Sequence, residues 1–169
     1  MPVHAAGNVL EGININVSNS SGGSGGNPGS SNSWDRFNLK KVSVNFIQEL
    51  LPATVKWLNK VDFVDRSYWL GTASQYLQIA EEARSLDHNY VIDRFDCDDF
   101  SAVLYCYARY KYGCNGIARV FDWLARHSYN LCMDKEGNTY VIEPQTCQIW
   151  PVWDRPRKLY KLLFGLIIW

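Results

Sequence analysis

Residues 95–101 are Phe95-Asp96-Cys97-Asp98-Asp99-Phe100-Ser101, and this stretch predicts the start of a long helix. Asp96 is a good N-cap, and an acidic residue three positions later completes a capping box. The expected helix runs from Cys97 to about Tyr112 and ends at Gly113, because glycine commonly follows the last turn of a helix. The apolar side chains at helical spacing, which we expect to be buried, are Phe100, Val103, Leu104 and Tyr107.

Other helices are predicted earlier in the chain. The segment Thr72-Ala73-Ser74-Gln75 has the pattern of a second capping box, and the helix that it opens is expected to extend to about Leu86. Residues 39–60 are apolar at mixed spacing and contain Pro52, so we expect a helical segment that is broken at the proline.

After Gly116 the hydrophobic pattern changes to that of strands. Strands are expected at residues 117–124, 127–133 and 139–145, with a last one within 158–169. Residues 134–138 contain a glycine and are predicted to join the second and third of these strands as a hairpin loop. Helices followed by an antiparallel sheet predict an α+β fold.

The first 33 residues differ in composition from the remainder, which we expect to form one domain over residues 34–169. Residues 18–30 are rich in Gly and Ser, which is typical of a flexible linker. Ahead of them, alternating apolar residues at 13–17 indicate one short strand, which cannot fold alone. Residues 1–33 are therefore predicted to be an arm that docks on a larger assembly or on another copy. The alternative is a disordered tail or an expression artefact.

The charge and cysteine content narrow the classes of partner and compartment. The 17 basic and 17 acidic side chains balance, so neither nucleic acid nor an anionic membrane is expected as a partner. Five cysteines without a CxxC pair give no zinc motif and leave at least one free thiol in a monomer. The N-terminus lacks a signal-peptide pattern, and the apolar run at 162–169 is too short to span a bilayer. These features predict a reduced protein that is cytoplasmic or virion-associated.

Three segments carry the side chains of a possible thiol-dependent site. Cys97 lies at a helix start, where the backbone N–H groups favour a thiolate. His127 begins the segment His-Ser-Tyr-Asn, and Glu143 lies in Ile-Glu-Pro-Gln. If Met133 pairs with Thr139 in the hairpin, His127 and Glu143 share one face of the sheet as diagonal neighbours. The predicted catalytic residues are Cys97 as nucleophile, His127 as base and Glu143 as the group that orients the base.

The acidic residues around Cys97 oppose this activation, because negative neighbours raise the pKa of a thiol. Either these carboxylates point away, or a cation neutralises them. Calcium prefers oxygen ligands, and the residues that would supply them are Asp98, Asp99, Glu143 and Gln145. Calcium is therefore a hypothesis; the alternative is that the carboxylates only stabilise the first turn of the helix.

The motifs Cys-Asp-Asp-Phe-Ser, His-x-x-Asn and Ile-Glu-Pro-Gln, which fall within residues 95–146, resemble the papain-like and transglutaminase-like cysteine peptidase superfamily. The closest pattern is that of the peptidase domain of agglutinin-type fungal lectins, although no lectin domain is present here. The resemblance implies helices packed on an antiparallel sheet, with Cys97 as nucleophile at a helix N-terminus, His127 as base and Glu143 as third member. It also implies calcium dependence through Asp98, Asp99 and Gln145. One departure is the lack of an upstream Gln that would supply the oxyanion hole.

The leading functional hypothesis is thus a cysteine hydrolase, a peptidase that acts on polypeptide substrates through a thioester acyl-enzyme. A second hypothesis is a transglutaminase or acyltransferase, in which an amine replaces water. A third is a structural component of a virion or phage tail that carries an active or retired peptidase domain.

Overall fold

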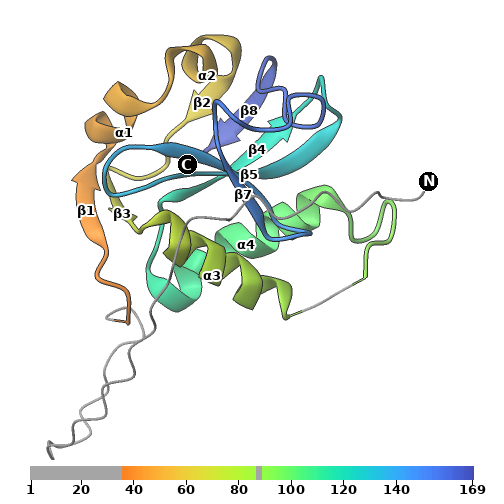
Figure 1. The fold of residues 1–169 in the computed structure, drawn as a ribbon, viewed down its shortest axis with the longest axis horizontal. Helices are drawn as coiled ribbons and strands as arrows, with labels where there is room; N and C mark the ends of the chain where they lie inside the picture. The colour runs from red at the N-terminus through yellow and green to blue at the C-terminus, as the bar shows by residue number, and fades with distance from the viewer. Residues whose placement is uncertain (1–35, 87–88) are drawn as a thin grey trace, which may run out of the picture. The chain divides into compact units, whose positions relative to one another are not determined.

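The computed structural model describes residues 36–86 and 89–169 (Figure 1). The predicted arm at residues 1–33 lies outside the described residues. In chain order the elements are β1 (Lys40–Ser43), α1 (Val44–Leu50), α2 (Ala53–Leu58), β2 (Lys60–Asp62), β3 (Ser67–Leu70), α3 (Ala73–Arg84), α4 (Cys97–Tyr112), β4 (Ile117–Asp122), β5 (His127–Met133), β6 (Thr139–Glu143), β7 (Gln148–Pro151) and β8 (Gly165–Ile168).

A six-stranded sheet in the order β2-β8-β4-β5-β6-β7 forms the centre of the domain, and β1 and β3 form a separate two-stranded sheet. Strands β4 to β7 follow one another as an antiparallel meander, and β8 is antiparallel to β4. β2 pairs with β8 in parallel. The sheet is therefore mixed, and the prediction of an antiparallel sheet is wrong at this edge. Lys60 pairs with Leu166, and local periodicity carries no information about a partner so far along the chain.

The two long helices begin where the sequence predicted. The Thr72 hydroxyl accepts from the Gln75 N–H at 3.2 Å, and the Gln75 side chain accepts from the Thr72 N–H at 2.8 Å, so the α3 capping box is confirmed. α4 begins after the N-cap Asp96 and ends at Gly113, which adopts a left-handed conformation with φ of 61°. These boundaries are determined by contacts between residues only a few positions apart, which is why they can be read from the sequence.

The main sheet is covered on both faces (Figure 1). One apolar cluster includes Ile47 of α1 and Val55 of α2 and meets the sheet at Leu131. The other includes Ile79 of α3 and Leu104 of α4 and meets the opposite face of the same strand at Cys132. Because side chains alternate along a strand, neighbouring β5 residues enter different clusters. β5 is therefore buried along almost its whole length, and its first residue, His127, lies at the edge of that buried region.

Residues 39–60 follow the prediction in part. Pro52 does separate two helical segments, α1 and α2, but short strands stand before and after them. The short strands β1, β2, β3 and β7 have no counterpart among the predicted strands. Each is three or four residues long, too short to display a clear period.

Candidate functional site

Cys97 is the first residue of α4, and its position follows from the capping of that helix. The Asp96 carboxylate accepts from the Asp98 N–H at 3.4 Å. The Asp99 carboxylate in turn accepts from the Asp96 N–H at 3.2 Å, which completes the predicted box. Cys97 is half-buried and carries a free thiol. The structure thus places the predicted nucleophile at the helix start that the sequence indicated.

His127 and Glu143 meet across the β5–β6 hairpin. Met133 pairs with Thr139, as the sequence argument assumed, and the pairing continues along the hairpin to Asn130 and Ile142. The His127 Nε2 lies 2.7 Å from the Glu143 Oε2. The structure therefore has the register that the sequence argument assumed, and the contact that follows from it between the imidazole and the carboxylate is present.

The Glu143 carboxylate is buried, with a residue exposure of 5%, and receives three hydrogen bonds. Besides His127, the Tyr160 hydroxyl donates to Oε2 at 2.9 Å, and the Gln145 N–H donates to Oε1 at 3.1 Å. A carboxylate can be buried when several donors compensate its lost hydration. These donors fix the carboxylate in place, and through it the orientation of the His127 ring.

Aromatic rings surround the imidazole. The ring centroids of Tyr129 and Tyr160 lie 5.6 Å and 5.7 Å from that of His127. Burial, together with the negative charge of Glu143, raises the pKa of Tyr160 far above its usual value, so its hydroxyl remains a donor. Sequence reasoning missed Tyr160, because no motif or period marks residues 152–164.

Asp122, at the end of β4, is a second buried carboxylate beside the site, with 2% exposure. It accepts from the Tyr129 hydroxyl at 2.9 Å, the Leu162 N–H at 2.8 Å and the Ala125 N–H at 3.0 Å. These bonds tie the β4–β5 turn to the C-terminal segment. Sequence reasoning missed Asp122 as well, since no motif marks it and its Leu162 partner lies 40 residues along the chain.

Cys97 and His127 line one cavity of about 300 Å³. Its complete lining is Cys97, Asp98, Phe121, Asp122, Trp123, Arg126, His127 and Ser128. Burial raises the pKa of the Cys97 thiol, and the charges of Asp96 and Asp98 raise it further, whereas the Ser128 N–H acts in the opposite direction. The expectation that the helix start favours a thiolate is therefore outweighed, and the thiol needs a base to remove its proton.

The acidic residues at the helix start interact with each other. A hydrogen bond between the two carboxyl groups raises the pKa of Asp98 and lowers that of Asp96. Within residues 36–86 and 89–169, the side chains of Asp96, Cys97 and Asp98 form a group whose ligand atoms lie within 4.8 Å of one another. Of the predicted calcium ligands, that group contains Asp98 alone.

The other predicted calcium ligands take part in hydrogen bonds in the described part of the chain. Asp99 is occupied as part of the capping box, and both oxygens of Glu143 already accept hydrogen bonds. Gln145 contacts Glu143 through its backbone N–H. The group at the helix start contains neither Asp99 nor Glu143, and a calcium site at Asp98, Asp99, Glu143 and Gln145 stays a prediction.

Comparison with known proteins gives likeness of fold alone. No family model matches the chain, and no curated protein matches it by sequence. A solved structure of a PSL1a–E64 complex matches 76% of this chain and 51% of its own, with a TM-score of 0.57 and 16% identity. A Polyporus squamosus lectin bound to the human-type influenza-binding epitope Neu5Aca2-6Galb1-4GlcNAc matches 75% of this chain and 49% of its own, with a TM-score of 0.53 and 18% identity. The chain spans about half the length of these proteins.

These comparisons contradict the identification made from motifs. The matching structures carry the names of a lectin and of PSL1a, and neither is described as a papain-like or transglutaminase-like peptidase. The assignment to that superfamily and the papain-like fold class are corrected accordingly: the domain is a mixed α/β fold similar to these structures. Three short motifs describe a helix start and a hairpin, and unrelated folds can contain such local elements.

The functional predictions that depended on that family are corrected with it. The cysteine hydrolase or peptidase, its transglutaminase and acyltransferase alternative, the virion-component alternative and the polypeptide substrate are contradicted by the lectin likeness. The positions of Cys97, His127 and Glu143 are observations of this structure and do not depend on the family.

No helix within residues 36–86 and 89–169 is long and apolar enough to cross a membrane. The cytoplasmic or virion-associated location stays a prediction.

Proposed function

We propose that this chain is a ligand-binding protein in which Cys97 forms a covalent bond with ligands that contain an electrophilic carbon. The observation that carries this proposal is the 2.7 Å contact between the His127 Nε2 and the Glu143 Oε2, beside a cavity that Cys97 also lines. A buried carboxylate that orients an imidazole in a cavity that also holds a thiol supplies a base for that thiol.

The proton can be followed through the site. When Nε2–H of His127 donates to Glu143, Nδ1 is the ring nitrogen that is free of hydrogen and can accept a proton. The Cys97 thiol gives its proton to Nδ1, and the sulfur attacks the ligand carbon. With iodoacetamide, the C–S bond forms, the C–I bond breaks and iodide leaves. The product is a stable thioether, so binding needs no turnover.

Labelling with iodoacetamide tests this function, and the chain supplies an internal control. Cys106 is an exposed thiol on the same helix, whereas Cys97 is half-buried. If accessibility alone determined the rate, Cys106 would react first. We expect Cys97 to react faster, and His127→Ala to slow Cys97 by about 100-fold while the rate at Cys106 is unchanged. Peptide mass spectrometry reports both rates in one sample.

Two outcomes would count against a reactive thiol at Cys97. One is a wild-type protein in which Cys106 reacts before Cys97; this comparison needs no variant and cannot be obscured by misfolding. The other is a His127→Ala protein of normal circular dichroism in which Cys97 keeps its wild-type rate. E64 is a second probe, since PSL1a was solved with it: an adduct on Cys97 in the intact mass is expected, and its loss in Cys97→Ser is the control.

Glycan binding is a second candidate function. It is favoured by the fold likeness to a lectin solved with a sialylated trisaccharide and by Trp153, which is 64% exposed at the mouth of another cavity. Exposed tryptophan rings stack on the apolar face of sugars, because the ring buries C–H groups without losing hydrogen bonds. Calorimetric titration with Neu5Ac-Gal-GlcNAc tests this function, and no heat of binding at millimolar sugar would count against it.

A further inference from the structure

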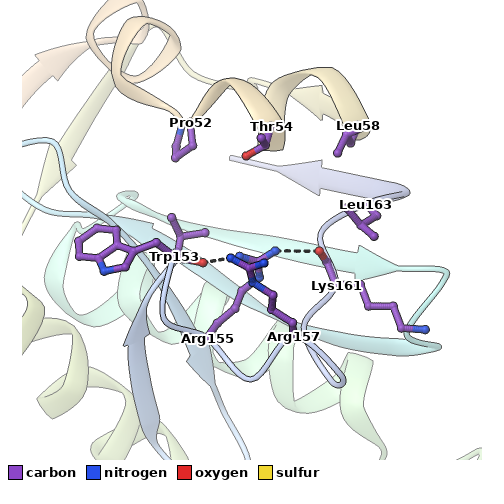
Figure 2. Close-up of a pocket in the computed structure, with 9 residues that line it drawn as sticks. Pro52, Thr54, Leu58, Trp153, Arg155, Arg157, Lys161 and Leu163 are labelled. Carbon is purple, nitrogen blue, oxygen red and sulfur yellow. Dashed lines mark hydrogen bonds between the residues drawn. The ribbon is translucent and has the colours of Figure 1, made fainter.

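A second cavity, of about 470 Å³, lies between α2 and the C-terminal segment (Figure 2). Pro52, Thr54 and Leu58 lie on one side of it, and Trp153, Arg155 and Arg157 face them from the other (Figure 2). Val152, Lys161 and Leu163 complete the lining. The cavity is distinct from the one that Cys97 lines, because the two have no lining residue in common.

The charged side chains of this cavity are all positive. Its lining contains Arg155, Arg157 and Lys161 and no carboxylate. None of the three forms an ion pair within 4.0 Å among residues 36–86 and 89–169. In a chain of zero net charge, three cations without a paired carboxylate create a local positive potential that attracts an anion.

Two of these cations are held in place by the backbone. The Arg155 guanidinium donates to the carbonyl oxygens of Val152, Tyr160 and Lys161, which shapes the segment that carries the other residues. Figure 2 shows the bond to Lys161. The Lys161 Nζ donates to the Leu124 carbonyl at 2.8 Å. Arg157 is exposed and has no such bond in the described residues. Arg157 is therefore the cation best able to donate to a ligand, and Arg155 and Lys161 supply fixed charge behind it.

The remainder of the lining is suited to a compact ligand with apolar C–H groups. The Trp153 ring is 64% exposed, and Leu58 and Leu163 are 42% and 50% exposed. A sugar that carries a carboxylate combines an anion with a face of C–H groups, so it matches both properties of the cavity. A free inorganic anion would satisfy the cations but leave the apolar surface in water.

We propose that the cavity between α2 and the C-terminal segment binds carboxylated sugars, with Arg157 as the donor to the carboxylate and Trp153 as the stacking surface. This proposal rests on the glycan-binding candidate function and names its site and ligand class. It predicts that the carboxylate contributes most of the selectivity, because a neutral sugar leaves the cations without a counter-charge.

Calorimetric titration with three probes tests the site: the trisaccharide Neu5Ac-Gal-GlcNAc, its neutral part Gal-GlcNAc, and inorganic sulfate. We expect the trisaccharide to bind at least about tenfold more tightly than the disaccharide, and to weaken as salt is added. Arg157→Gln and Trp153→Ala should each weaken the trisaccharide by about tenfold. Lys158→Gln and Trp57→Ala are the matched controls, because both residues are exposed and neither lines the cavity; they should bind as the wild type does.

The results of these titrations distinguish a wrong binding site from a wrong glycan-binding function. If the trisaccharide binds but the two cavity variants bind as well as their controls, the glycan function stands and this site is wrong. If acidic and neutral sugars bind equally, the ligand class is wrong. If sulfate binds as tightly as the trisaccharide, the cavity recognises any anion and the sugar assignment is wrong. If no sugar binds, the glycan function and the site fail together.

Discussion

Glu143 is the residue at which the site and the stability of the fold can be tested together, through the substitution Glu143→Gln. The carboxylate receives donors at both oxygens: His127 and Tyr160 at Oε2, and the Gln145 N–H at Oε1. A glutamine of nearly the same shape offers one oxygen and one NH₂ group. Whichever way the amide turns, its NH₂ faces at least one of these donors, so at least one hydrogen bond is lost.

The expected cost follows from these contacts. Loss of a hydrogen bond to a charged group destabilises a protein by about 1.5–3 kcal/mol. Removing the charge also removes the cost of burying it, so we expect about 2 kcal/mol. For a domain of this size, that lowers the melting temperature by about 6–10 °C. The substitution should also slow iodoacetamide labelling of Cys97, because the His127 ring loses its fixed orientation.

Thermal unfolding followed by circular dichroism measures the first effect, and peptide mass spectrometry measures the second. Glu49→Gln is the matched control, since Glu49 is exposed and makes no hydrogen bond among the described residues that involves its carboxylate; it should melt with the wild type. The reasoning is refuted if Glu143→Gln also melts within ~1 °C of the wild type. Such a result would mean that the three contacts contribute nothing net to stability.

Three further predictions concern other carboxylates. Asp122→Asn should destabilise the domain by about 2–3 kcal/mol in urea unfolding, because an amide cannot accept from all three of its donors; an unchanged midpoint would contradict this. Burial opposes ionisation of Glu82, but hydrogen bonds from Lys111 and Tyr112 outweigh it and lower the pKa of Glu82 to about 2. The stability that the ionised Glu82 contributes is therefore complete above its unfolded pKa of 4.5 and is lost as the pH falls towards 2. In Glu82→Gln, the free energy of unfolding should change less with pH across that range than it does in the wild type. Added calcium should raise the melting temperature above that measured with a chelator, and Asp98→Asn should abolish this rise. Equal melting temperatures with calcium and with chelator would contradict the calcium prediction.

Local contacts explain which parts of the fold could be predicted. Both capping boxes join residues three positions apart, so the starts of α3 and α4 can be predicted from a few neighbouring residues. The β5–β6 hairpin is also local, and its glycine-containing loop was enough to predict it, whereas the pairing of Met133 with Thr139 was assumed and is the register that the structure has. The contact between His127 and Glu143 follows from that register.

Long-range contacts explain what was missed. Tyr160 donates to Glu143, 17 residues away in the chain, and Asp122 accepts from Leu162, 40 residues away, and no motif marks either contact. The parallel pairing of β2 with β8 joins two short segments from opposite ends of the domain. The family assignment failed for a related reason: it used short motifs, which describe local geometry, to infer a complete fold and an activity.

The sequence by itself determined the extent of α4, the position of Cys97 at its first residue and the β5–β6 hairpin, in which an assumed register placed His127 beside Glu143. These features depend on neighbours along the chain, whose interactions are the same in any fold that contains the helix and the hairpin. The tertiary structure decided the direction of the Cys97 pKa, the third donor to Glu143 and the existence of a cationic cavity beside α2. Each of these depends on burial and on charges from distant segments, which exist only after the chain has packed.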